Sequence, residues 1–217
     1  SLLKMHKMGL IYRSEHPVYW CTACVSALAK TDTDEAERET KLHYVNFELQ
    51  GKPLQIATTR PELMHACVAV AHNPKDERYN TLGAKIVTTA LGKEVPFIAD
   101  ADVDKDFGSG VVMVCTFGDK QDIVWMYKHK LPLIRAMDEH GRLTNAGELN
   151  GMKISEARNK LLEKFRSEGL LVKSAKLRQA IKVHDRCKKP IEFLLSMQWF
   201  AKITEKSDEI IESAQKI

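Results

Sequence analysis

The sequence lacks any apolar run near the roughly 20 residues that a membrane-spanning helix requires. Lys and His interrupt the apolar residues of its first segment, SLLKMHKMGLIYR, at short intervals. We therefore expect neither a signal peptide nor a membrane partner, and a cytoplasmic location. Strong charge of either sign is also absent, because 33 Lys and Arg stand against 29 Asp and Glu. This small excess neither implies nor excludes a nucleic-acid partner, which clustered basic residues would indicate.

Cysteine is scarce and odd in number, with five residues in a chain of 217. Without a secretory signal, this count argues against a disulfide framework and favours reduced thiols. The chain is 44% hydrophobic and 29% charged, which is ordinary globular composition and excludes disordered and collagen-like proteins. Its last helical pattern, TEKSDEIIESAQKI, carries no stop signal and its first residue is Ser1, so we expect a piece of a longer protein.

Short strand-like runs fill the middle of the chain. KLHYVNFEL alternates with period two, and PLQIATT, CVAVA, AKIVTTA, VPFIA and GVVMVCTF follow it. Glycine and proline turns separate these runs at intervals too short for regular βαβ units. The sequence thus predicts a β-rich α+β fold whose sheet is curved or barrel-like rather than doubly wound. The acidic segment before the first run, KTDTDEAERE, is interpreted as a turn.

Helical patterns surround this strand-rich body. One covers residues 2–9 and ends near Gly9, and a second begins at Asp119, whose carboxylate can cap free amides. A third, ISEARNKLLEKFRSEG, has apolar residues at helical spacing and Gly169 as its stop. The C-terminal segment supplies the fourth. We expect these helices to lie around the sheet.

Two short motifs far apart in the chain offer metal ligands. Cys21 and Cys24 form a C-x-x-C motif, and His184 and Cys187 form an H-x-x-C motif. Three thiolates and one imidazole complete a closed tetrahedral shell, which is typical of structural zinc. Such a site would join the two ends of the chain as a zinc-ribbon-like stem. The alternatives are a pair of buried thiols beside a surface histidine, or a redox motif, which the lack of a surrounding βαβ unit disfavours.

Two strand ends carry polar side chains. One is the segment TTRPE, whose proline fixes the following turn, so its hydroxyls, guanidinium and free amides would be presented at a rim. The other, GSGVVMVCTFGDKQD, ends a strand and starts the helix on which Asp119 and Asp122 face the same way. Alternatively, Asp119 is only a helix cap and Asp122 only a favourable first-turn acid. Cys67 and Cys115 are interpreted as small core residues.

Five segments together resemble the editing insertion, or connective peptide, of class I aminoacyl-tRNA synthetases of the valine, isoleucine and leucine group. They are GLIYRSEHPVYWCTAC, ATTRPEL, GSGVVMVCTFGDKQD, GMKISEARNKLLEKFRSEGLL and HDRCKKPIEFLLSMQWF. TTRPEL followed by ACVAVAHNP, with CTFGDKQD, is most similar to the archaeal valyl type, because the isoleucyl type typically has Trp after TTRP and the leucyl type Asp. The HIGH-like and KMSKS-like nucleotide-binding signatures are absent, so neither ATP binding nor amino-acid activation is expected of this chain.

The resemblance implies hydrolysis of threonine esterified to the 3′ end of valine tRNA. A hydrophobic pocket rejects an added hydroxyl only about 100-fold, a limit for which valyl enzymes are themselves the standard example. By this resemblance Asp122 binds the α-ammonium of the ester and Asp119 accepts from the threonine hydroxyl. Thr58, Thr59 and Arg60 hold the terminal adenosine. A positioned water, assisted by the ribose hydroxyl, then attacks, so catalysis is mainly orientation and electrostatic stabilisation.

The sequence departs from the common bacterial pattern at several of these positions. Met113 stands where Lys is usual, Leu63 where Thr follows RPE, and Gly118 where His is usual. Recognition of the hydroxyl must then be divided differently, and Thr116 is the natural substitute donor. The candidate catalytic residues are Asp122, Asp119 and Thr116, and the candidate substrate-binding residues are Thr58, Thr59, Arg60, Glu62, Leu63, Met113 and Cys115.

The resemblance also implies a domain organisation and partners. Residues 1–49 and 171–217 would form the two halves of the stem, and residues 50–170 the editing core. The partners would be the 3′ end of a mischarged tRNA and the rest of the parent synthetase, with structural zinc as the cofactor. Two alternatives stay open: an isoleucyl-type editing domain that removes valine, or a non-catalytic zinc-ribbon module that binds RNA.

Overall fold

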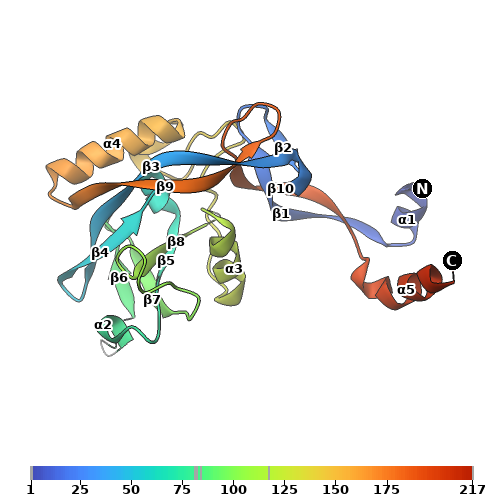
Figure 1. Ribbon diagram of the computed structural model, residues 1–217, viewed down its shortest axis with the longest axis horizontal. Helices are drawn as coiled ribbons and strands as arrows, with labels where there is room; N and C mark the ends of the chain where they lie inside the picture. The colour runs from blue at the N-terminus through green and yellow to red at the C-terminus, as the bar shows by residue number, and fades with distance from the viewer. Residues whose placement is uncertain (1, 81–82, 84, 117, 217) are drawn as a thin grey trace. The chain divides into compact units, whose positions relative to one another are not determined.

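The computed structural model describes residues 2–80, 83, 85–116 and 118–216, and Figure 1 labels its elements. The chain divides into two compact units, Ser1–Val18 with Leu195–Ile217, and Tyr19–Leu194. The strands are β1 Ile11–Cys21, β2 Ser26–Leu28, β3 Thr33–Leu49, β4 Lys52–Thr58, β5 Cys67–His72, β6 Ile86–Thr88, β7 Glu94–Ala99, β8 Val111–Cys115, β9 Leu171–His184 and β10 Glu192–Ala201. The α-helices are α1 Leu2–Lys7, α2 Glu77–Asn80, α3 Lys120–Lys128, α4 Ile154–Ser167 and α5 Ser207–Gln215, and the 3-10 helices are η1 Lys30–Asp32, η2 Pro61–Ala66, η3 Gly147–Leu149 and η4 Thr204–Lys206.

The smaller unit contains the two helices nearest the ends of the chain, α1 and α5, and parts of strands β1 and β10. Aromatic contacts join its two chain segments: Tyr12 stacks on Phe200 with 5.7 Å between ring centroids, and the Arg13 guanidinium lies 5.7 Å from the Trp199 ring. No helix in the described part of the chain is long and apolar enough to cross a membrane.

The larger unit is built on a mixed sheet with the strand order β4-β3-β6-β7-β5-β8. Only β5 and β7 pair in parallel; the other neighbours on this path are antiparallel. The first and last strands of the path, β4 and β8, contact each other, so the sheet curls towards closure. The β-rich α+β fold with a curved sheet is thus confirmed. The core strand β5 is buried at every position, which explains why its sequence, CVAVAH, is apolar without alternation.

A long two-stranded ribbon extends this sheet. Strand β9 pairs with β3 from Thr33 opposite His184 to Val45 opposite Leu171. The predicted turn at KTDTDEAERE is therefore wrong, since the described residues there form η1 and the first half of β3. Most of these positions are exposed, so hydrophobic alternation is missing and charged pairs lie across the strands instead. Glu35 contacts Lys182, and Glu39 contacts Lys176 at 3.3 Å.

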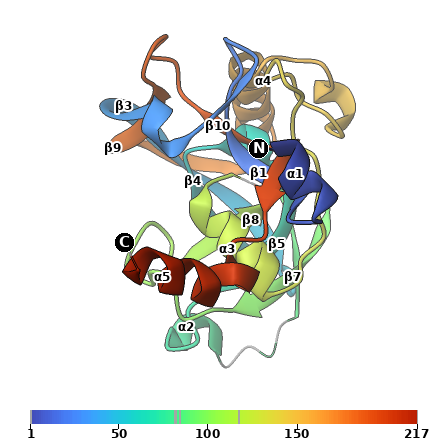
Figure 2. The same ribbon diagram turned by 90° about the vertical axis from the view of Figure 1, so that its right-hand side faces the viewer.

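The predicted helices form where expected. Helix α4 buries Ala157, Leu161 and Phe165 and contacts η2 and β9. Helix α3 contacts β8, beside which it lies in Figure 2. At the far end of α3, the buried Asp100 carboxylate accepts hydrogen bonds from Lys128 Nζ and from His129 Nε2. These bonds connect the C-terminal end of α3 to the residue that follows β7.

Candidate functional sites

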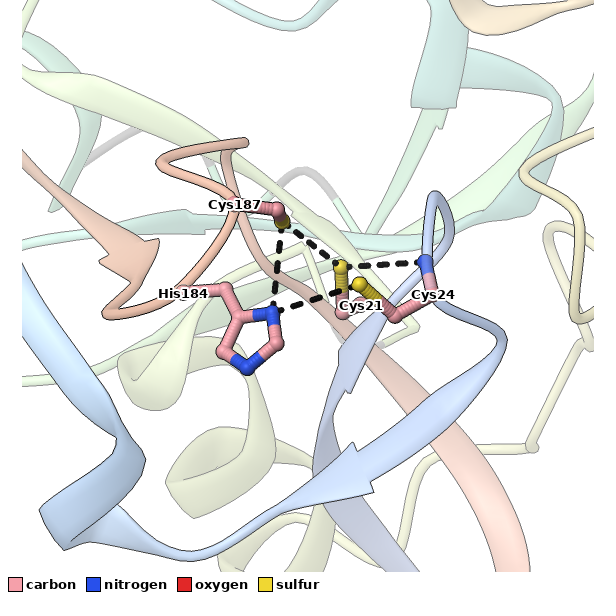
Figure 3. A group of neighbouring side chains, drawn as sticks. All are labelled: Cys21, Cys24, His184 and Cys187. Atoms are coloured by element: carbon pink, nitrogen blue, oxygen red, sulfur yellow. Dashed lines mark hydrogen bonds between the residues drawn. The ribbon is translucent and has the colours of Figure 1, made fainter.

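The four predicted metal ligands lie together. Figure 3 shows the side chains of Cys21, Cys24, His184 and Cys187 pointing toward one another. Their ligand atoms all lie within 4.8 Å of one another: the Sγ atoms of Cys21 and Cys187 are 3.5 Å apart, and His184 Nδ1 is 3.2 Å from Cys187 Sγ. Sulfur ligands at about 2.3 Å from zinc in a tetrahedron are about 3.8 Å apart, so the arrangement fits this metal.

Two similar backbone turns position these ligands, although 160 positions separate Cys24 from His184. Each turn follows the end of a strand, β1 or β9, and each has a residue with positive φ directly after its second ligand: Val25 at 52° and Lys188 at 56°. A β-branched residue rarely adopts this conformation, so the turn at Val25 is strained. A bound metal would offset that strain.

Hydrogen bonds shift the pKa values of two thiols of the cluster in opposite directions. The backbone N–H of Lys189 lowers the pKa of Cys187 to about 7, whereas hydrogen bonding to Cys21 and Cys187 raises the pKa of Cys24 to about 11. His184 presents Nδ1 to the thiols and Nε2 to Asp185, whose carboxylate lies 3.4 Å away. A carboxylate behind a ligating imidazole fixes the ring and raises its basicity. Cys21 and His184 are buried, whereas Cys187 is half-buried and Cys24 is exposed.

The TTRPE segment forms the second candidate site, where β4 ends and η2 begins. Thr58 is buried, and its Oγ1 accepts a hydrogen bond from the Arg60 backbone N–H at 2.9 Å. Thr59 is half-buried. Pro61 occupies the first turn of η2, and the next two residues, Glu62 and Leu63, are buried. This strand end therefore has one hydroxyl used locally and one partly open to solvent.

An ion network that the sequence did not indicate surrounds Glu62. Its carboxylate is fully buried and accepts hydrogen bonds from Arg60 Nε at 2.5 Å and from Arg158 Nε and Nη2 at 2.8 and 2.7 Å. Arg60 Nη2 also donates to Glu192 at 2.9 Å. Burial alone would raise the pKa of Glu62, but the two guanidinium groups lower it. The network joins the strand end to α4 and β10, and its partners come from distant segments without a local motif.

We expect Glu62→Gln to lower the free energy of unfolding by about 2 to 4 kcal/mol. Removing one member of a fully buried ion pair costs about 3 to 5 kcal/mol, and here Arg60 and Arg158 are 26% and 32% exposed, which reduces the cost. Because the pKa of Glu62 is lowered by folding, its contribution is present above the unfolded pKa and lost as pH falls through the folded value. Urea unfolding at pH 7 and in acid tests this. Equal stability of the Glu62→Gln and Glu163→Gln proteins at pH 7 would contradict it, Glu163 being an exposed acid of α4.

Strand β8 and the turn after it carry further candidate residues, and β8 contacts both β4 and η2. Met113, Cys115 and Thr116 are all buried. Thr116 Oγ1 accepts from the Ile134 backbone N–H at 3.1 Å, which leaves its own hydroxyl proton to donate elsewhere. Cys115 lies opposite Cys67 in the β5–β8 pairing, and this neighbour together with burial raises the pKa of its thiol. Both cysteines are thus core thiols, as the sequence predicted.

The two aspartates of α3 occupy different environments. Asp119 is exposed and caps the helix, because its Oδ1 accepts from the Asp122 backbone N–H at 2.8 Å. Asp122 is buried, at 7% exposure, and has no ion-pair partner in the described part of the chain. Burial, and then the charge of Asp119, raise the pKa of Asp122 well above its usual range. A cation bound beside this buried carboxyl would stabilise its charged form.

Gly118 lies close to both Asp122 and Leu63, the residue that follows the TTRPE segment. A Cβ atom built on Gly118 would lie 2.4 Å from Asp122 Oδ2 and 3.5 Å from Leu63 Cδ1. A side chain at position 118 would displace the Asp122 carboxylate, so Gly118 leaves room for it. Cys115 lies within the electrostatic reach of both Asp122 and Arg60. The ends of β4 and β8 thus meet at one place.

Comparison with protein families identifies the family to which this chain belongs. The family described as tRNA synthetases class I (I, L, M and V) matches residues 1–217. The chain belongs to the class I tRNA synthetases. It is similar along its whole length to valine–tRNA ligases: 45% identical over 229 residues to that of Methanopyrus kandleri and 48% over 224 residues to that of Pyrococcus furiosus. The resemblance to the archaeal valyl type is confirmed.

The synthetase chain spans about a quarter of the length of these relatives, since 25% of each is covered. Among solved structures, a LeuRS–tRNA–LeuAMS ternary complex from Agrobacterium radiobacter is 17% identical, with a TM-score of 0.46, covering 90% of this chain and 32% of that one.

Proposed function

We propose that this chain hydrolyses the ester between threonine and valine tRNA, the editing reaction of a valyl-type synthetase. The observation that carries the proposal is the buried carboxyl of Asp122 beside the TTRPE strand end. Its relatives are valine–tRNA ligases, which must discriminate two nearly isosteric amino acids. A second pocket that reads the hydroxyl supplies the missing discrimination.

In this proposal the carboxylate of Asp122 holds the α-ammonium of the aminoacyl ester. A free amino acid ester carries its ammonium two bonds from the reactive carbonyl carbon, so one charge-assisted contact orients the scissile bond. Asp119 or Thr116 forms the hydrogen bond to the threonine hydroxyl. Correctly attached valine leaves that acceptor or donor unsatisfied and is spared.

Thr58, Thr59 and Arg60 bind the terminal adenosine in this proposal, with Glu62 holding the Arg60 guanidinium in place. Leu63, Met113 and Cys115 form the apolar wall beside the substrate, and their burial in the described structure supports this role. Catalysis then rests on a positioned water and a fixed ester rather than on a protein nucleophile.

A structural zinc ion is part of the same proposal. Cys21, Cys24, His184 and Cys187 would hold it, and it would supply cross-linking of segments distant in sequence. We also propose residues 50–170 as the editing core, with residues 1–49 and 171–217 as the stem that leads to the rest of the synthetase. The 3′ end of a mischarged tRNA is the partner of the core.

Deacylation assays with the purified chain test the proposal. Thr-tRNA, Val-tRNA and Ile-tRNA are offered separately, and release of the amino acid is measured. We expect hydrolysis of the threonine ester well above that of the other two. Preference for the valine ester on isoleucine tRNA would support the isoleucyl alternative, and tRNA binding without any hydrolysis would support the RNA-binding module.

Specificity gives a second measurable result. Asp119→Leu should reduce the ratio of Thr-tRNA to Val-tRNA hydrolysis by about 10- to 150-fold, because a hydrogen bond to a charged group contributes about 1.5 to 3 kcal/mol. Thr116→Val removes a neutral hydroxyl, whose hydrogen bond contributes about 0.5 to 1.5 kcal/mol, and should reduce the ratio about 2- to 10-fold. Asp119→Asn and Thr116→Ser keep a polar atom in place and serve as matched controls for helix capping and packing. An unchanged ratio in both apolar variants would show that another group reads the hydroxyl.

A further inference from the structure

Besides the candidate ester site, the larger unit contains a polar pocket. It has a volume of about 340 Å³ and is lined by residues of β3, β9 and α4. In Figure 1, α4 lies alongside the β3–β9 ribbon, whose paired strands supply the other wall. None of its lining residues belongs to the candidate ester site or to the metal cluster.

The walls of this pocket carry an excess of positive charge. Lys41, Arg158 and Arg166 line it, against a single acid, Glu163. Arg158 is paired with the buried Glu62, but the side chains of Lys41 and Arg166 have no hydrogen-bond or ion-pair partner among the described residues. Both side chains are exposed, so their charges are available to an anion from outside the chain.

The buried histidine of the pocket is also affected by this excess of positive charge. His43 is 5% exposed, and its Nδ1 lies 2.8 Å from the Ser174 hydroxyl. Its pKa is lowered first by burial and then by the positive charges of Arg158, Lys41 and Arg166, and only Glu62 acts in the opposite direction. The positive charges of these three residues therefore act on the buried side chain of the pocket, although Lys41 and Arg166 are themselves exposed.

We propose that this pocket binds a phosphate group between Lys41 and Arg166. A phosphate offers several strong acceptor oxygens and more than one negative charge, which matches an ammonium and a guanidinium on facing walls of one pocket. Arg158 lines the same pocket and also donates to Glu62, the carboxylate that holds Arg60. This site is independent of the proposed hydrolase activity, since it uses none of the residues assigned to that reaction.

Titration of the whole 217-residue chain with inorganic pyrophosphate tests the proposal. Binding is followed by calorimetry and by amide NMR at about 0.15 M salt, where diffuse surface attraction is largely screened. We expect saturable binding that Lys41→Gln and Arg166→Gln each weaken about tenfold or more, as for loss of one charge-assisted hydrogen bond. Glu163→Gln should instead strengthen binding several-fold. Lys41, Arg166 and Glu163 lie outside the ion network of Glu62, so the fold is retained in these variants.

Matched variants separate the pocket from net charge. Lys52→Gln and Glu37→Gln make the same charge changes at exposed positions outside the pocket, and binding should not change. Absence of saturable binding, or equal effects of Lys41→Gln and Lys52→Gln, would overturn the proposal.

A competition arm then identifies the source of the phosphate. An RNA hairpin with the acceptor-stem end of a tRNA is added to the pyrophosphate complex. Displacement that Lys41→Gln weakens supports the pocket and assigns it a backbone phosphate of RNA. Pyrophosphate binding that the hairpin does not disturb supports the pocket and assigns it a small phosphate compound. Neither result depends on whether the chain hydrolyses an ester.

Discussion

Asp122→Ala is expected to lower the deacylation of Thr-tRNA about a hundredfold, an order of magnitude typical of lost positioning of a reactive group. Asp122→Asn keeps the size and removes the charge, and should be nearly as damaging. Hydrolysis rates under single-turnover conditions measure the effect. Glu156→Gln is the matched control, because Glu156 is also an acid in the first turn of a helix, α4.

Replacing Asp122 should lower the rate of deacylation without lowering the stability of the fold. Folding raises the pKa of Asp122, mainly through burial. A carboxyl with a raised folded pKa costs stability above its unfolded pKa, near 4, and the cost is absent in acid. Asp122→Asn should therefore be at least as stable as the parent chain at pH 7. Lost activity without lost stability separates a substrate contact from a structural role.

A substrate with an acylated amino group provides the decisive comparison for Asp122. Acylation removes the positive charge that the carboxylate would pair with, so the parent chain should cleave N-acetyl-Thr-tRNA poorly. The Asp122→Ala variant should be penalised far less by the same modification. If the parent chain cleaves both substrates equally well, Asp122 is only a helix-start carboxylate.

If the four ligands hold one zinc ion per chain, as proposed, Cys187→Ser is expected to lose it together with several kcal/mol of unfolding free energy. A ligand present at 1000 times its Kd stabilises a fold by about 4 kcal/mol. Structural zinc sites commonly have larger binding free energies than this. Metal analysis gives the zinc content, and denaturation with and without a chelator gives the linked stability. Cys187→His, which offers another zinc ligand, should restore part of both.

Cys67→Ser is the control for this experiment. Cys67 is fully buried in β5 and far from the metal cluster in sequence, so its replacement should cost packing energy but leave the zinc content at one per chain. Freshly purified parent chain without zinc would contradict the site. Hydrolysis that falls in strict proportion to zinc content would instead indicate a catalytic metal.

The sequence by itself predicted the features that depend on short spacing. The C-x-x-C and H-x-x-C motifs identified four ligands whose atoms the structure brings within 4.8 Å, because each motif forms its own turn at the end of a strand. Helix α3 begins after Asp119 because a carboxylate at that position caps free amides. Buried runs such as CVAVAH indicated strands of a β-rich fold by composition alone.

The tertiary structure alone decided which distant segments meet. Residues 33–40 are too charged to indicate a strand, and they form one because β9 supplies their hydrogen-bond partners. The pairing of Glu62 with Arg158 and of Arg60 with Glu192 was likewise absent from any local pattern. The same holds for the position of Asp122 against Leu63. Periodicity and capping act over a few residues, whereas register between distant strands and the burial of ion pairs arise only when the whole chain packs.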